Sequence, residues 1–178
     1  MIWVWLRRIC AFSLAALIGW AATVWLTPRF ILTIAHHRMA GLAGGVNQIA
    51  HLPQVTPQNQ TIVRPAPDLL YSACAYDLSD GPVAVTVGAT PGYWSASFFD
   101  AATNNFTTTN SHTYGEGRTQ FQLDTKPAPE HDMAYHVVSP TRKGVVLIRR
   151  RIASQTQLLK LRQAQAGDAC APAAPPAP

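Results

Sequence analysis

An uncharged run of eighteen residues near the amino terminus constrains the fold of this chain more than any other feature: residues 9–26, ICAFSLAALIGWAATVWL. As a helix that rises about 1.5 Å per residue, the run would measure about 27 Å, just enough to cross the hydrocarbon core of a bilayer. Arg7 and Arg8 precede it, and Pro28 follows it. The run therefore predicts one transmembrane helix.

The arginine pair predicts the orientation of that helix. Basic residues stay on the cytoplasmic side of a span, so Arg7 and Arg8 favour a cytoplasmic amino terminus, with the rest of the chain exported to the periplasm. A cleaved signal peptide is the alternative, because residues 15–22 offer small residues at which it could be cut. The apolar run continues past such a site to Leu26, which favours a retained signal anchor over residues 1–29.

Residues 30–59 predict a membrane-proximal helix followed by a linker. Apolar residues from Phe30 to Leu42 recur at helical spacing, and Gly44 and Gly45 would end the helix. Prolines at positions 53 and 57 are typical of an extended connection.

Residues 60–166 predict a mainly β domain. Val83, Val85 and Val87 alternate with smaller or polar residues, and residues 94–98 repeat the alternation. Such short segments, spaced by about 10 to 15 residues, indicate an antiparallel sandwich or an open barrel. Residues 154–157 resemble a capping box, which predicts a short carboxy-terminal helix. Residues 167–178 (GDACAPAAPPAP) predict a disordered Ala/Pro tail.

Composition and charge exclude several classes of protein. The chain has 178 residues, which suits about one domain and excludes a multidomain enzyme and a polytopic transporter. Its 14 prolines and 11 glycines exclude a coiled coil. Its net charge is +5, and three of its basic residues form the run 149–151. We interpret this run as a solvated strand end. A nucleic-acid-binding protein would need a basic face interleaved with base-stacking aromatic residues, and this sequence shows no such face.

The three cysteines, Cys10, Cys74 and Cys170, lack the spacing of a metal site. In an oxidising compartment Cys74 and Cys170 could form a disulfide that ties the tail to the domain. A buried free Cys74 with a mobile Cys170 is an equal alternative.

Two sets of polar residues are candidates for chemistry. Glu130, His131, Asp132 and His136 are the densest group of potential metal ligands. However, His131 and His136 would face opposite sides of a strand, and the segment follows Pro127-Ala128-Pro129 as an exposed loop would. We therefore predict neither a metal nor a cofactor.

The second set lies at predicted strand ends and comprises Asp68, Tyr71, Asp100, Asn104 and Asn105. If these ends share one rim of the sandwich, the side chains could bind a small polar ligand or support catalysis. The alternative is that they satisfy backbone groups in turns, as Asp and Asn often do.

Several ordered motifs are similar to those of the bacterial domain-of-unknown-function family numbered 1254. They are Arg64-Pro65-Ala66-Pro67-Asp68-Leu69-Leu70-Tyr71-Ser72, Asp77-Leu78-Ser79-Asp80-Gly81-Pro82-Val83, residues 93–100 and Thr103-Asn104-Asn105-Phe106. The resemblance covers about residues 60–165. Ala66 and Leu69 depart from the family pattern, which has Asn and Thr there, so neither can contribute a polar side chain.

The resemblance implies a β-rich, sandwich-like domain without a settled activity. In longer relatives a second domain, of the family numbered 1214, follows; in short membrane-anchored relatives that half tends to be a separate small protein. The resemblance thus implies a companion subunit at the bacterial inner membrane. Two hypotheses follow: a non-catalytic binding or assembly module, or a ligand-binding or enzymatic site at the sandwich rim.

Overall fold

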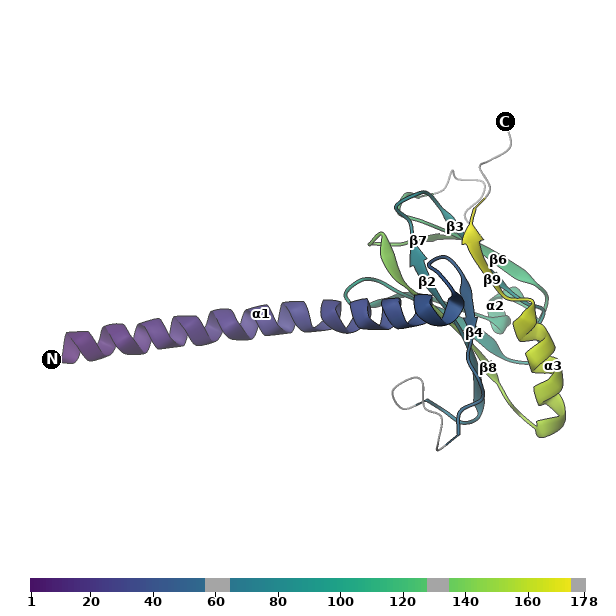
Figure 1. The fold of residues 1–178 in the computed structure, drawn as a ribbon, viewed down its shortest axis with the longest axis horizontal. Coiled ribbons are helices and arrows are strands. Elements are labelled where there is room, and N and C mark those ends of the chain that lie inside the picture. Colours follow the sequence, from purple (N-terminus) through teal and green to yellow (C-terminus); the bar gives the residue numbers. More distant parts are fainter. Residues whose placement is uncertain (57–64, 128–134, 174–178) are drawn as a thin grey trace.

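One long helix is joined to a two-layer β domain (Figure 1) in the computed structural model, which describes residues 1–56, 65–127 and 135–173. The helices are α1 (Ile2–Ala43), α2 (Ser111–Tyr114) and α3 (Gln155–Ala166). The strands are β1 (Ile49–His51), β2 (Leu69–Asp77), β3 (Val83–Val87), β4 (Trp94–Phe99), β5 (Asn105–Asn110), β6 (Thr119–Asp124), β7 (His136–Val138), β8 (Lys143–Arg151) and β9 (Ala169–Pro172). The prediction of a mainly β domain with a short carboxy-terminal helix is confirmed.

Helix α1 differs from the two predicted segments, because its 42 residues form one uninterrupted helix about 63 Å long. Pro28 lies inside it and lacks the N–H that would bond to the carbonyl group four residues earlier. The helix ends at Gly44, whose φ of 85° is left-handed and whose N–H donates to the Ala40 carbonyl oxygen. Packing of its last third on the β domain explains why the helix continues past the proline.

The two ends of α1 have different surroundings. The helix is long and apolar enough to cross a membrane, and none of its most apolar window is buried within the molecule. Leu32, His36 and Met39 are its buried residues, spaced so that they share one face. Only this later part of α1 belongs to the packing of the domain.

The strands form two sheets. One has five strands in the order β1-β2-β8-β4-β5, and the other has four in the order β7-β6-β3-β9. All neighbouring strands are antiparallel except β6 and β7, which are parallel. In the pairing of β8 with β2, Val146 lies opposite Cys74 and Leu147 opposite Ala73.

The main core lies between the two sheets and is built from the residues of each strand that point inward. It includes Tyr76, Val85, Trp94, Phe98, Phe121, Leu123, Val146 and Ile148. The outer face of the five-stranded sheet has its own small apolar cluster, in which Met39 of α1 packs on Ala73 and Ala75 of β2. His36 Nε2 lies 3.0 Å from the carbonyl oxygen of Tyr76. Helix α1 therefore lies across the outer face of this sheet.

The carboxy-terminal segment also differs from its prediction. Ser154 caps α3 by accepting a hydrogen bond from the Gln157 N–H, as the predicted capping box requires. The predicted disordered tail, however, begins with an ordered strand: β9 pairs with β3, placing Cys170 opposite Val85. Pairing with β3 supplies the stabilisation that this Ala/Pro-rich sequence lacks by itself.

Candidate functional site

The structure does not bring the five predicted rim residues together. Asp68 precedes Leu69, which lies opposite Arg151 at the end of β8. Asp100 follows Phe99, which lies opposite Val145 near the start of β8. Six residues of extended strand separate these positions, about 20 Å, more than one small-ligand pocket spans. The hypothesis of one shared rim site is therefore not supported.

At the first of these ends, the polar groups stabilise the local turn. The Tyr71 hydroxyl oxygen accepts a hydrogen bond from the Ala66 N–H at 3.0 Å. The Asp68 carbonyl oxygen accepts one from the Ile152 N–H at 2.8 Å, and its side chain is exposed.

At the second end, Asp100 closes the turn between β4 and β5. Its Oδ1 accepts hydrogen bonds from the N–H groups of Ala102 and Asn104, and its Oδ2 accepts one from Asn104 Nδ2 at 2.9 Å. Burial raises the pKa of Asp100, but these hydrogen bonds and the charge of Arg29 outweigh it, so the pKa lies below its ordinary value. Asn105 bonds to Thr108 within β5. The arrangement matches the structural alternative.

Tyr76, also near this end, is a buried residue that sequence reasoning did not select. Its hydroxyl donates to the Phe99 carbonyl oxygen at 3.0 Å and contacts Ser139 Oγ at 2.9 Å. Burial raises the pKa of Tyr76, although the hydrogen bond with Ser139 opposes the shift. The phenol therefore stays protonated at neutral pH and links β2, β4 and the segment before β8.

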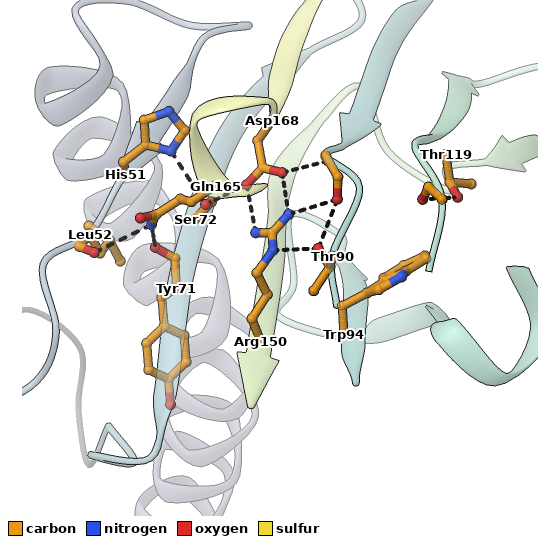
Figure 2. A network of polar contacts seen from close by, with 12 residues as sticks. His51, Leu52, Tyr71, Ser72, Thr90, Trp94, Thr119, Arg150, Gln165 and Asp168 are labelled. Atoms are coloured by element: carbon orange, nitrogen blue, oxygen red, sulfur yellow. Dashed lines mark hydrogen bonds and ion pairs between the residues drawn. The ribbon is translucent and has the colours of Figure 1, made fainter. Parts of the chain in front are cut away.

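The most concentrated polar network lies inside the sandwich, around Arg150 and Asp168 (Figure 2). Both side chains are 0% exposed and form an ion pair. Arg150 donates through both terminal nitrogens to the Asp168 carboxylate and through Nε to Thr90 Oγ1 at 2.8 Å. The interpretation of residues 149–151 as a solvated strand end is thus wrong for Arg150, because strand alternation turns this residue inward.

The Asp168 carboxylate also joins β2 and the end of β3 to this network. Its Oδ2 accepts a hydrogen bond from Ser72 Oγ of β2 at 2.6 Å, and its Oδ1 accepts one from the Gly88 N–H at 2.9 Å. Nearby, Gln165 Nε2 of α3 donates to the Tyr71 carbonyl oxygen at 2.8 Å (Figure 2). Because both charges are paired and shielded from solvent, the network holds the sheets and α3 together rather than binding a ligand.

Cys170 lies two residues after Asp168 and forms a disulfide with Cys74 of β2, with the Cα atoms 6.3 Å apart. The bond joins the two sheets, because β9 belongs to one and β2 to the other. The free cysteine is Cys10, which is exposed on α1.

An open hollow of about 480 Å³ lies beside the starts of β4 and α2, lined by Gly92, Tyr93, Ser111, His112, Glu116 and Arg151. The Tyr93 and His112 rings are 5.5 Å apart. Among the residues that the structure describes, no hydrogen bond joins Ser111, His112 and Glu116 to one another, so no nucleophile is aligned with a base. The hollow offers hydrogen-bonding groups without a catalytic arrangement.

The predicted metal-ligand candidates are tested only in part. His136 lies in β7, opposite Gln122 of β6. Glu130, His131 and Asp132 lie outside the described residues. Within residues 1–56, 65–127 and 135–173, no group of three His, Cys, Asp or Glu side chains could hold a metal ion.

Two solved structures share this fold. The VPA0106 protein from Vibrio parahaemolyticus has a TM-score of 0.55 at 15% sequence identity over 88% of this chain. An uncharacterized protein from Burkholderia cenocepacia has a TM-score of 0.50 at 16% identity over 67% of this chain. This chain covers only 41% and 35% of those two chains, respectively.

The family comparison agrees with the resemblance seen in the motifs. No curated protein matches the chain. The family model described as "Protein of unknown function (DUF1254)" matches residues 46–172, which extend from the end of α1 through β9. The chain therefore belongs to the DUF1254 family.

Proposed function

We propose that this protein is a non-catalytic binding or assembly module anchored in the inner membrane by α1. The observation that carries the proposal is the dual role of this helix. Its first part exposes large apolar side chains, including Phe12 at 77% and Trp20 at 66%, whereas Leu32, His36 and Met39 are buried against the domain. An exposed apolar surface of this extent needs a membrane or a partner to cover it.

The orientation follows from the basic residues that flank the apolar run. Arg7 and Arg8 favour a cytoplasmic amino terminus, which places the β domain in the periplasm. An oxidising compartment is also one in which the bond between Cys74 and Cys170 would persist.

The partner that we propose is a separate membrane-anchored protein carrying the family 1214 half. This partner is the one implied by the resemblance of the motifs to the family numbered 1254, in whose short membrane-anchored relatives the second half tends to be a separate small protein. The polar groups at the strand ends and in the interior are engaged in structural contacts, which favours binding over catalysis.

A topology reporter combined with affinity capture tests the proposal. The reporter, active only in the periplasm, is fused after Pro178, which keeps β9 (Ala169–Pro172) intact. We expect an active reporter and a stoichiometric membrane protein captured with the full chain. A fusion carrying residues 1–43 alone is the control and should capture no partner, because it lacks the β domain.

The outcomes separate the parts of the proposal. A cytoplasmic reporter signal would overturn the orientation. Repeated capture of the bait alone from mild detergent would overturn the assembly role. Capture of the same partner by residues 1–43 would move the interaction from the β domain to the helix.

A further inference from the structure

Helix α1 covers only part of the outer face of the five-stranded sheet. It contacts this face near the start of β8, where Val145 and Leu147 line an apolar groove with Ile31. Past Leu147, β8 continues toward α3, which lies on the side of the domain farthest from the amino terminus (Figure 1). The next outward residue of β8 is Arg149, about 7 Å beyond Leu147. This end of β8 therefore lies away from the apolar run.

The strand register shows which side chains share the outer face with Arg149. Arg149 lies opposite Ser95 of β4, and Ser97 lies opposite Thr108 of β5. Alternate residues of a strand project from the same face of the sheet. The outward positions of β8, β4 and β5 beyond the α1 contact form what we call the arginine surface: Arg149, Arg151, Ser95, Ser97, Thr108 and Asn110. It contains two positive charges and no acidic residue.

The half-buried side chain of Arg149 is held in place on this surface with donors unused. Its Nη2 donates to Ser97 Oγ at 2.7 Å, and this oxygen lies 3.3 Å from Thr108 Oγ1. Among the residues that the structure describes, its buried Nε has no hydrogen-bond partner. Its Nη1 donates to no described residue either, but is not buried. The guanidinium group can therefore bind a further acceptor without leaving Ser97.

Arg149 also lacks a counter-charge within the described part of the chain, where the ion pairs are Lys143 with Asp77 and Arg150 with Asp168. Strand alternation turns Arg150 inward to its carboxylate and turns Arg149 outward. A guanidinium group matches the two oxygens of a carboxylate with parallel hydrogen bonds. Charge complementarity therefore favours an acidic group from another molecule as the occupant of this surface.

The surroundings of Arg149 favour a protein as the source of that group. The Tyr93 carbonyl oxygen accepts a hydrogen bond from the Arg151 N–H at 3.1 Å, and the Tyr93 side chain is 40% exposed. Arginine and tyrosine are enriched among the residues that contribute most to binding at protein interfaces. A lipid phosphate is less favoured, because β8 leads away from the apolar run to reach Arg149.

We infer that the arginine surface is where the β domain binds its partner protein, and that an aspartate or glutamate side chain of the partner pairs with Arg149. The carboxylate accepts hydrogen bonds from Nη1 and from the second hydrogen of Nη2, while the first stays on Ser97. This inference rests on the proposed function of a binding or assembly module. It adds the surface of the module and the chemistry of the partner segment.

The rate at which captured partner is released tests the role of Arg149 in the full-length chain. Arg149→Gln should release the partner about tenfold faster or more during washing in mild detergent, because loss of one member of an interfacial charge pair speeds dissociation. Arg118→Gln is the matched control, since it removes the same charge from an exposed position before β6 of the other sheet. It should leave the release rate unchanged. Thermal melting followed by circular dichroism verifies that both variants are folded.

Cross-linking tests the surface with Arg149 left intact. Thr108, exposed beside Ser97, is replaced by cysteine in a Cys10→Ala background and labelled with a photo-reactive group under non-reducing conditions. The Thr108→Cys label should cross-link the captured partner. Gln120→Cys, exposed on β6 in the other sheet, is the matched control and should not.

The cross-linked peptide identifies the partner segment and allows a charge exchange. Arg149→Glu alone should abolish retention of the partner. Replacing the acidic residue of that segment by arginine should restore retention to Arg149→Glu but not to the unchanged chain. Loss of retention that no such replacement restores would overturn the ion pair.

The remaining outcomes separate this inference from the proposed function. Equal release from the unchanged chain and from Arg149→Gln would overturn the inference and leave the assembly role intact. Cross-linking of the partner from position 120 alone, or of lipid or a second copy of this chain from position 108, would also overturn it. An unchanged chain that retains no partner would overturn the proposed function, and this inference with it.

Discussion

A charged side chain buried in this protein lowers the stability of the fold unless the opposite charge is buried beside it. Arg150 and Asp168 are both fully buried, and each would be strongly destabilising alone. Their bidentate contact, supplemented by hydrogen bonds from Ser72 and Gly88, offsets the loss of solvation. At this scale the ion pair matters because the loss of either partner would leave an uncompensated charge in the interior.

Replacing Asp168 by asparagine should destabilise the protein by about 3–5 kcal/mol, because the Arg150 charge then remains buried without a counter-charge. Urea unfolding of the detergent-solubilised chain measures this loss. The double variant Arg150→Met/Asp168→Leu should recover much of it, since neither charge remains. A cost below about 1 kcal/mol for Asp168→Asn would show that the carboxylate is not the required counter-charge.

Asp100 should make the stability of the protein depend on pH in the acidic range. Because its pKa is lowered in the folded state, its contribution is complete above the ordinary value of 3.8 and is lost as the pH falls through the folded value. The difference in unfolding free energy between wild type and Asp100→Asn should therefore be largest at neutral pH and shrink below pH 3.8. Asp80→Asn, at an exposed position, serves as the control. A difference in unfolding free energy between wild type and Asp100→Asn that does not change with pH would contradict the prediction.

At the scale of elements, the end of β3 and the turn between α3 and β9 depend on one another. Gly88 follows β3 and is buried, and a Cβ atom there would collide with the Ala164 carbonyl oxygen and lie 3.1 Å from the Gly167 Cα. The Gly88 N–H also donates to Asp168. This close approach of two backbones brings the carboxy-terminal segment into the four-stranded sheet.

Gly88→Ala should therefore destabilise the protein by about 1–3 kcal/mol, because the two backbones must separate. Thermal denaturation of the full chain in detergent measures the effect. Gly117→Ala is the matched control, since a Cβ there meets no atom within 4 Å; it should change stability by no more than about 0.5 kcal/mol. Equal effects of the two substitutions would contradict the proposed role of Gly88.

The disulfide should be detectable by counting thiols. Alkylation of the denatured, unreduced chain should modify Cys10 alone, and alkylation after reduction should modify all three cysteines. Reduction should also lower the stability by about 2–4 kcal/mol, because the bond closes a long loop. Modification of three cysteines without reductant would show that Cys74 and Cys170 are not bonded.

Local sequence patterns predicted whether a segment forms a helix or a strand better than they predicted which other segments it pairs with. Two-residue alternation predicted β3 and β4, and the Ser154 cap predicted the start of α3. Strand β9 was missed because its order comes from pairing with β3, about 85 residues earlier. The shared rim failed for a related reason: the start of β2, after Asp68, and the end of β4, before Asp100, lie at opposite ends of β8, and only the register reveals this.

The whole molecule combines an apolar rod and a β domain through one continuous helix (Figure 1). The first part of α1 has no contacts that bury it, whereas Met39 and Ala40 cover Ala73, Ala75 and Leu147 on the outer face of the sheet. The division between the exposed apolar segment and the domain therefore falls within α1 rather than at either of its ends.

Two truncations should reveal this division. Removing residues 2–26 should yield a domain that stays in solution without detergent and keeps the melting temperature of the full chain. Removing residues 2–43 should lower the melting temperature or cause aggregation, because the apolar outer face then meets water. Circular dichroism during heating compares the two, and equal melting temperatures would show that α1 does not stabilise the domain.

The position of Asp168 and Cys170 in the chain also determines when the domain can form during synthesis. Every other strand that the structure describes precedes these residues, and the four-stranded sheet lacks β9 until residue 172 has left the ribosome. Until then Arg150 has no counter-charge and Cys74 no partner. Helix α1 is thus synthesised long before the domain on which it packs can close, so the growing chain must be kept from aggregating until its last strand arrives.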